Sequence, residues 1–176
     1  PFYLAGDATN PAFTVNDTTG GLTLSGSLTN THGDITVVTA GGKLDLATHG
    51  VSAGASTEDG KNVSLTGRRI DQTSGTISVN GSTGGGTITL VGYDGTAQGS
   101  MSLAGTLETN NDTDEAVRIL GTTSLTLPSI SAPNGTVSLG QAGGEDDLIT
   151  VSIVQEAGAS VTAETLSIYA DDTAAT

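Results

Sequence analysis

A short hydrophobic pattern recurs along this chain: two aliphatic residues flank one residue that is usually Ser or Thr. Such alternation is the pattern of a β-strand with one buried face. The thirteen copies occupy residues 22–24, 35–37, 44–46, 63–65, 77–79, 88–90, 101–103, 117–119, 125–127, 137–139, 149–151, 161–163 and 166–168. Each copy is too short to form a core alone, so its inward pair must stack on neighbouring copies. The pattern predicts an all-β fold, a parallel β-helix (β-solenoid) with irregular loops.

The intervals between the copies set the expected size of this solenoid. They vary, and strict hexapeptide or nonapeptide repeats are absent, so we expect loops of unequal length. A coil of about 20 residues and a step of about 4.8 Å predict about seven coils over residues 20–170. Residues 1–19 hold three of the five aromatic residues and are expected to form an N-terminal cap or docking segment. Residues 171–176 are expected to be a C-terminal tail or linker.

Composition narrows the choice of fold. The chain has 176 residues, no Trp and 26 Gly, and its glycine-rich stretches are repeatedly interrupted by aliphatic pairs. Glycines at the corners of coils explain this pattern better than a disordered linker does. The alternative fold is a β-sandwich, which also consists of short strands and turns. The missing Trp and the many three-residue units favour the solenoid over the sandwich.

Charge and cysteine content exclude several classes of function. The net charge is −14 and only five Lys and Arg are present, so the chain cannot neutralise the phosphates of a nucleic acid. No hydrophobic run approaches 18 residues, which argues against membrane insertion. The absence of Cys removes disulfides and thiol catalysis.

The run 21–54, GLTLSGSLTNTHGDITVVTAGGKLDLATHGVSAG, resembles the repeats of filamentous haemagglutinin-like exoproteins, with their recurrent Gly-x-aliphatic-x-aliphatic pattern. Residues 75–92 and 121–140 are similar. The resemblance implies the repeat region of an adhesin with a right-handed parallel β-helix. It also implies export to the cell surface or the extracellular medium, and an adhesive or structural role.

These observations predict a secreted or cell-surface structural and adhesive module rather than an enzyme. It would form part of a long exoprotein or assemble end to end into a filament, because a parallel solenoid leaves unpaired strand edges at both ends. Self-association is the expected partnership, and surface glycans or other cells are further expected partners. The residues expected at the junction are Phe2, Tyr3, Phe13, Val15 and Tyr169.

A carbohydrate-active β-helix enzyme, either a lyase or a hydrolase, is the alternative from another class. Such an enzyme needs carboxylates grouped with basic residues on one face of the solenoid. The sequence separates the candidate basic residues from one another, so we expect no catalytic residues; these candidates are His32, His49, Arg68, Arg69 and Arg118.

An ice-binding solenoid is a second alternative. Eleven of the thirteen central residues of the repeated units are Ser or Thr, and only Asp45 and Arg118 differ. Stacked in register, these residues would form columns of hydroxyl groups. Thr also favours strands for general reasons, so a structural solenoid explains the same residues.

Calcium is the expected cofactor if the protein has one. The turn 110–115 places three acids and two amides within six residues, and the candidate ligands are Asn111, Asp112, Asp114 and Glu115. Calcium prefers six to eight oxygen ligands, which loops of this composition supply. A second acidic run lies at 145–147. Neither segment matches an EF-hand loop.

Overall fold

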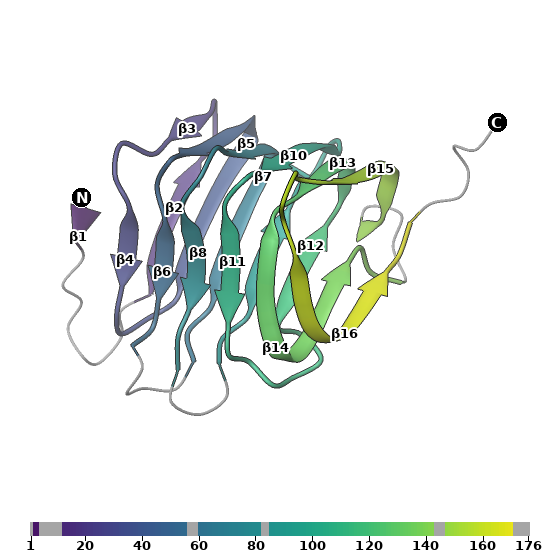
Figure 1. The fold of residues 1–176 in the computed structure, drawn as a ribbon. Coiled ribbons are helices and arrows are strands. Elements are labelled where there is room, and N and C mark those ends of the chain that lie inside the picture. The colour runs from purple at the N-terminus through teal and green to yellow at the C-terminus, as the bar shows by residue number, and fades with distance from the viewer. Residues whose placement is uncertain (1, 4–11, 56–59, 82–84, 143–146, 171–176) are drawn as a thin grey trace.

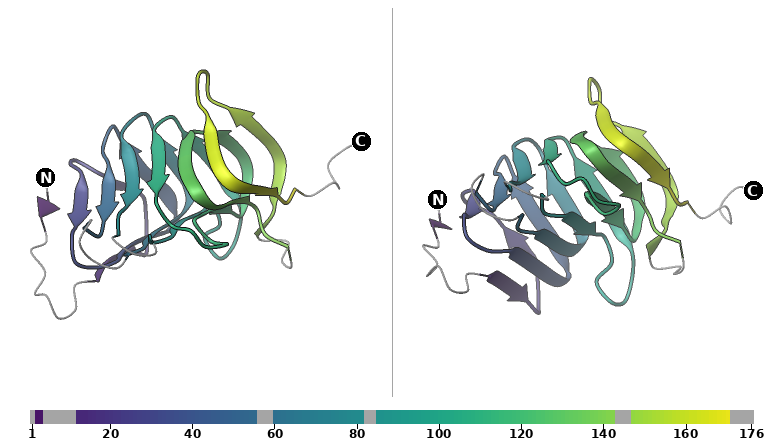
Figure 2. Two further views of the ribbon diagram at one scale, coloured as in Figure 1. Left: turned by 60° about the horizontal axis from the view of Figure 1, so that its bottom comes forward. Right: turned by 90° about the horizontal axis from the view of Figure 1, so that it is seen from below.

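The computed structural model describes residues 2–3, 12–55, 60–81, 85–142 and 147–170. Over these residues the chain forms a parallel β-solenoid and contains no α-helix (Figure 1). The strands stack along one axis from β1 at one end to β16 at the other, and Figure 2 shows the same stack from two further directions. The predicted all-β solenoid is therefore confirmed.

Three faces make up the solenoid, and each face is a stack of parallel strands. Face 1 consists of β2 (Phe13–Asp17), the first parts of β5 (Ile35–Ala47) and β7 (Val63–Gln72), β9 (Ile88–Val91), β12 (Val117–Leu120), and the second parts of β14 (Ser129–Leu139) and β16 (Val161–Ile168). Face 2 consists of β3 (Leu22–Thr23), the second parts of β5 and β7, β10 (Gly99–Leu103), β13 (Thr122–Leu127) and β15 (Ile149–Gln155). Face 3 consists of β1 (Phe2–Tyr3), β4 (Leu28–Asn30), β6 (Val51–Ala53), β8 (Thr76–Val79), β11 (Thr106–Thr109) and the first parts of β14 and β16.

The solenoid makes six turns between β2 and β16, fewer than the seven expected. The turns are longer than the expected 20 residues because most carry loops. Pairing of Val117 with Val137 gives a turn of 20 residues, whereas pairing of Val137 with Leu166 gives one of 29. Six steps of about 4.8 Å place β2 and β16 about 29 Å apart.

Aliphatic side chains fill the interior in columns that run along the axis. On face 3, for example, Val51, Ile77 and Leu107 stack in register and are fully buried. The residue between two inward positions faces outward, as Ser78 does beside buried Ile77. Burial of one such aliphatic side chain contributes about 1.5–3 kcal/mol. The predicted assignment of inward and outward positions is confirmed for the units from 35–37 to 137–139.

Glycine at the corners permits close contact between successive coils. A Cβ atom on Gly42 would collide with the backbone carbonyl of Gly20, and one on Gly86 would collide with that of Lys61. Both obstacles are backbone atoms, so a side chain at either position would push neighbouring coils apart. The high glycine content is therefore explained in part by the stacking distance.

One predicted unit, 149–151, is wrong. Thr122 pairs with Ile149, but Ser124 pairs with Ser152, so β15 carries one residue more than β13 at this bulge. The bulge turns Val151 outward, and its side chain is 70% exposed. Ile153 then takes the inward position beside Leu125.

The N-terminal segment takes part in the stack. In residues 1–19, expected to be a cap or docking segment, β1 pairs with β4 and β2 pairs with β5. Phe13 lies beside Ile35 and Val15 beside Val37, so β2 continues face 1. The expected tail 171–176 lies outside the described residues.

Candidate functional site

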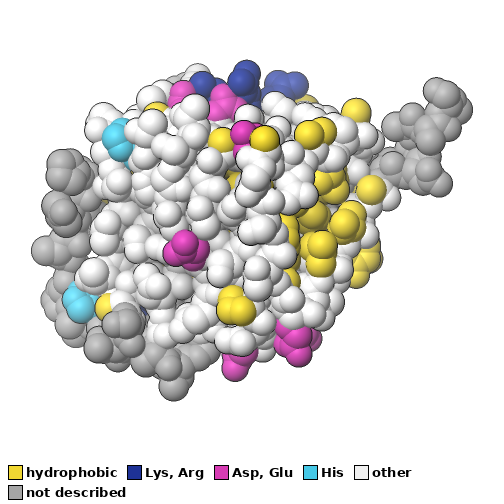
Figure 3. All heavy atoms as spheres, viewed as in Figure 1, with side chains coloured by type: hydrophobic (Ala, Val, Ile, Leu, Met, Phe, Trp, Pro, Cys, Tyr) yellow, Lys and Arg dark blue, Asp and Glu magenta, His cyan; other side chains and the backbone are white. Residues whose placement is uncertain are grey.

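The C-terminal end of the solenoid exposes apolar side chains that would be buried in any earlier turn. Leu166 and Ile168 continue the columns of Val137 and Leu139 on face 1. Val137 and Leu139 are at most 1% exposed, whereas Leu166 is 47% and Ile168 55% exposed. The difference arises because no described strand lies beyond β16. Figure 3 shows hydrophobic side chains gathered on this end of the molecule.

The N-terminal end has a matching apolar surface. The side chains of Phe13, Val15 and Leu22 are half-buried and pack against the core. They border a groove of about 440 Å³, which Leu24 and Leu28 also line. Both ends of the solenoid therefore present inward-facing aliphatic and aromatic side chains.

The residues predicted for assembly lie at these two ends. Phe2, Tyr3, Phe13 and Val15 belong to the first strands of the stack. Tyr169 follows β16 at the other end, where its N–H donates to the Leu139 carbonyl at 2.7 Å. The fold thus separates the predicted junction residues into two surfaces, although association itself stays a prediction.

The residues predicted to bind calcium form a turn between β11 and β12. Asn111 is buried, and its Oδ1 accepts a hydrogen bond from the Thr113 N–H at 2.8 Å. Asp112 and Asp114 are exposed, and Glu115 faces Arg118 at 3.6 Å. Within the described part of the chain, no three His, Cys, Asp or Glu residues are close enough to hold a metal ion. The calcium site stays a prediction, and its second run, 145–147, lies largely outside the described residues.

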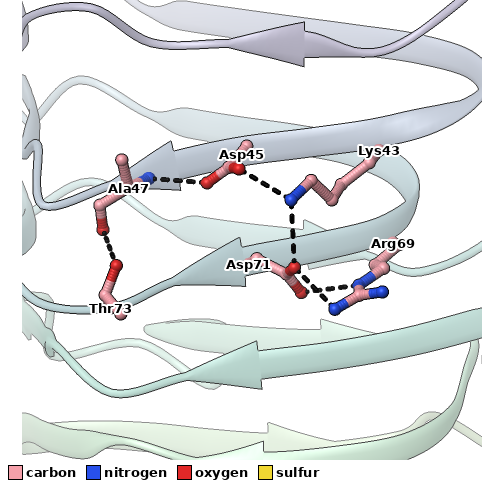
Figure 4. Close-up of polar contacts among 6 residues, drawn as sticks. All are labelled: Lys43, Asp45, Ala47, Arg69, Asp71 and Thr73. Carbon is pink, nitrogen blue, oxygen red and sulfur yellow. Dashed lines mark hydrogen bonds and ion pairs between the residues drawn. The ribbon is translucent and has the colours of Figure 1, made fainter.

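An ion-pair network lies on face 2, and the sequence pattern did not predict it. Lys43 Nζ lies 2.6 Å from Asp45 Oδ2 and 3.4 Å from Asp71 Oδ2, and Arg69 Nη2 lies 2.8 Å from the same Asp71 oxygen (Figure 4). Asp45 and Asp71 are register neighbours in successive coils. Lys43 therefore joins two carboxylates that would otherwise repel each other, and Arg69 adds a second positive charge beside Asp71.

The network shifts the pKa values of Lys43, Asp45 and Arg69. The hydrogen bond from Lys43, with a smaller contribution from the Ala47 N–H, lowers the pKa of Asp45. The hydrogen bond to Asp45 raises the pKa of Lys43, and the contact with Asp71 raises the pKa of Arg69. These shifts favour the charged forms of Lys43, Asp45 and Arg69 at neutral pH. The side chains are partly solvent-exposed, so each ion pair contributes little to stability, and Lys43 joins two neighbouring coils through its contacts with Asp45 and Asp71.

Arg69 is a register neighbour of Lys43 and pairs with Asp71, whereas the expected separation of His32, His49, Arg68, Arg69 and Arg118 from one another stays a prediction. A sequence signal existed, because Lys43-Leu44-Asp45 and Arg69-Ile70-Asp71 share the order basic, aliphatic, acidic at an interval of one turn. The two triplets are far apart in the sequence, so only the pairing of successive coils shows that they are neighbours.

A polar pocket of about 300 Å³ brings together residues relevant to the enzyme alternative. His32, Asp34, Lys61 and Asn62 line it. The Asp34 carboxylate, however, accepts the backbone N–H of Asn62 at 2.7 Å, a bond that joins two coils. Asp34 is the single carboxylate among the described residues that line this pocket, whereas the usual glycosidase mechanism uses two.

The outward hydroxyl groups form columns that charged residues interrupt. Thr14, Thr36, Ser64 and Thr89 are register neighbours on face 1, and Arg118 follows them. On face 3, Thr29, Ser52 and Ser78 are followed by Glu108. The Ser78 hydroxyl donates to that of Ser52 at 3.1 Å.

No family model, curated protein or solved structure matches the chain. Among the described residues, no helix has the length and apolar character required to span a membrane.

Proposed function

We propose that this chain is a structural and adhesive β-solenoid module of the cell surface or the extracellular space, which associates end to end. The observation that carries the proposal is the exposure of Leu166 and Ile168, which occupy core positions of a fold that repeats along its axis. Water contact with such side chains is unfavourable by about 25 cal/mol per Å² of apolar surface. A further coil stacked on this end would remove that contact.

The contacts that the described side chains make support a structural role. Inward positions form the core, and the ion pairs and corner hydrogen bonds described above join neighbouring coils. What remains on the lateral faces is a hydroxyl-rich surface, which offers donors and acceptors for glycans of other cells or of the same surface. Adhesion through these faces is the adhesive part of the proposal. The resemblance of its repeats to haemagglutinin-like exoproteins supports an extracellular or surface location.

Size-exclusion chromatography with light scattering tests the association. We expect masses at multiples of 17.3 kDa that rise with protein concentration, and rods of increasing length by negative-stain microscopy. The double variant Leu166→Lys, Ile168→Lys should remain monomeric, because charged side chains cannot be buried in the junction. Val151→Lys is the matched control, since Val151 is exposed at the same end but faces outward. A wild-type protein that stays monomeric at all concentrations would refute the proposal.

The adhesive part needs a separate measurement. Fluorescently labelled wild-type protein should bind to a glycan array, and the Leu166→Lys, Ile168→Lys variant should bind the same glycans more weakly because a monomer lacks multivalency. Absence of binding to any glycan or cell would remove adhesion and leave a structural module.

A further inference from the structure

The two ends of the solenoid are related by the register of face 1. The column that starts at Phe13 passes through Ile35, Val63 and their successors and ends at Leu166; the full series is Phe13, Ile35, Val63, Ile88, Val117, Val137, Leu166. The column that starts at Val15 ends in the same way at Ile168. A strand added beyond β16 would therefore need two inward residues, one beside Leu166 and one beside Ile168. The inward residues Phe13 and Val15 of β2 have the same spacing.

We infer that a second copy of this chain supplies that strand: β2 of one copy adds in parallel to the outer edge of β16 of another, with Phe13 beside Leu166 and Val15 beside Ile168. This inference rests on the proposed end-to-end association and specifies its geometry. The junction is then one more coil-to-coil interface of the kind that holds the solenoid together.

Backbone hydrogen bonding favours the same arrangement. Among the described strands, β16 pairs with β14 alone and β2 with β5 alone, so each has one edge to which no described strand pairs. Unpaired strand edges recruit further strands, and such β-augmentation derives affinity from main-chain hydrogen bonds and specificity from alternate side chains. The edges lie at opposite ends and run in the direction required for parallel pairing. Joining them is heterologous, so it propagates instead of closing as a dimer.

Faces 2 and 3 are compatible with this seam. On face 3 the column that contains Leu28 begins at Phe2 and ends at Val161, so β1 would lie beside β16. On face 2, the last described strand of one copy is β15, which precedes β16 along the chain. The first face 2 strand of the next copy is β3, which follows β2. One strand position therefore lies between β15 and β3 at the seam. Ala170 enters this position, because it forms a parallel bridge with Ile149. The junction thus preserves the three-faced path of the chain.

Cysteine pairs measure the register directly, because the chain contains no Cys of its own. Thr14 and Ser167 are the outward residues between the two inward pairs, and both belong to one outward column of face 1. In the proposed seam their Cα atoms are about 4.8 Å apart, within the range that a disulfide bridges. Asn16 lies two residues further along β2, which increases the separation from Ser167 to about 8 Å and exceeds that range.

The experiment mixes two single variants under mild oxidation with diamide and quantifies covalent dimers on a non-reducing gel. Thr14→Cys mixed with Ser167→Cys should give at least ten-fold more heterodimer than Asn16→Cys mixed with Ser167→Cys. Each single variant alone should give little dimer, and circular dichroism should show the wild-type fold for all three.

The outcomes separate the two proposals. If association persists but the Asn16 pair crosslinks as well as the Thr14 pair, the proposed seam is wrong while end-to-end association stands. The same holds if neither pair crosslinks in rods visible by microscopy. If the wild-type protein does not associate, both the association and the seam are refuted.

Discussion

The Asp34 carboxylate accepts a hydrogen bond from the backbone N–H of Asn62, 2.7 Å away and one coil further along the solenoid. Asn62 repeats the arrangement, because its Oδ1 accepts the backbone N–H of Thr87 at 2.9 Å. These three residues precede the stacked inward residues of face 1 and form a ladder along the corner between faces 3 and 1. The ladder satisfies corner N–H groups that a purely apolar corner would leave without protein partners.

The ladder should contribute measurably to stability. Asn62→Ala removes the acceptor for Thr87 and one donor to Asp34, and we expect a loss of about 1 kcal/mol in the free energy of unfolding. Ser64→Ala, which removes an outward hydroxyl from the next strand, is the control and should change stability by less than about 0.5 kcal/mol. Urea denaturation of both variants measures the difference. Equal midpoints would show that solvent replaces the ladder without loss.

A second prediction concerns the columns of the core. Ile77 is fully buried between Val51 and Leu107, so Ile77→Asp should cost more than about 3 kcal/mol by burying an unpaired charge. The neighbouring Ser78 faces outward beside Glu108. Ser78→Lys should therefore cost less than about 0.5 kcal/mol, since the new charge is exposed and lies beside an opposite one. Similar urea midpoints for the two variants would contradict the assignment of inward and outward positions.

The sequence predicts those columns because the alternation of period two survives in nearly every strand. It does not predict the outward turn of Val151, because a bulge adds one residue to β15 without changing the local hydrophobic pattern. The number of turns was overestimated for a related reason: loops of different length lie between strands that nevertheless pair in register. The hydrophobic pattern predicts which residues face inward. The register between strands depends on the length of the corner segments, which the hydrophobic pattern does not describe.

Candidate sites depend even more on register. The four members of the face 2 ion-pair network lie in two separate segments, and only their stacking brings Lys43 to Asp71. The oxygen-rich surroundings of Asn111, in contrast, predict a metal ligand, yet its side chain accepts a hydrogen bond from the Thr113 N–H within its own turn. Amide and carboxylate side chains in turns bond to nearby backbone N–H groups as readily as they bind metals, so composition alone does not distinguish the two uses.

The third prediction is a stabilising substitution. Gln72 is 2% exposed and lies between Ala47 and Leu103 in register, and neither its Oε1 nor its Nε2 has a hydrogen-bond partner among the described residues. A buried amide without partners costs about 1–3 kcal/mol. Gln72→Met keeps an unbranched side chain of similar size and removes the polar atoms, so it should raise stability by about 1 kcal/mol or more.

Gln72→Glu is the matched control for this site and should destabilise the protein strongly, because it buries a charge. The midpoints of urea denaturation compare both variants with the wild type. A destabilised Gln72→Met protein would contradict the prediction that the unpartnered amide lowers the stability of the fold.

The last prediction concerns pH. Asp94 Oδ1 accepts the Thr96 hydroxyl at 2.7 Å and the N–H groups of Thr96 and Ala97 at 2.9 Å each. These bonds, with the Thr96 hydroxyl as the largest contribution, lower the pKa of Asp94 from 3.8 to about 2. A carboxylate whose pKa is lower in the folded state stabilises that state above its unfolded pKa. This stabilisation is lost as the pH falls from about 4 to about 2.

Asp94→Ala should therefore lower the melting temperature at pH 7, and the difference from the wild type should shrink as the pH falls through that window. Thr96→Val is the matched second variant: it removes the hydroxyl and keeps the backbone donors, so its effect should have the same sign and be smaller. Melting curves between pH 7 and pH 2.5 measure both differences. A difference that stays constant over this range would show that the Asp94 carboxylate does not stabilise the turn through its charge.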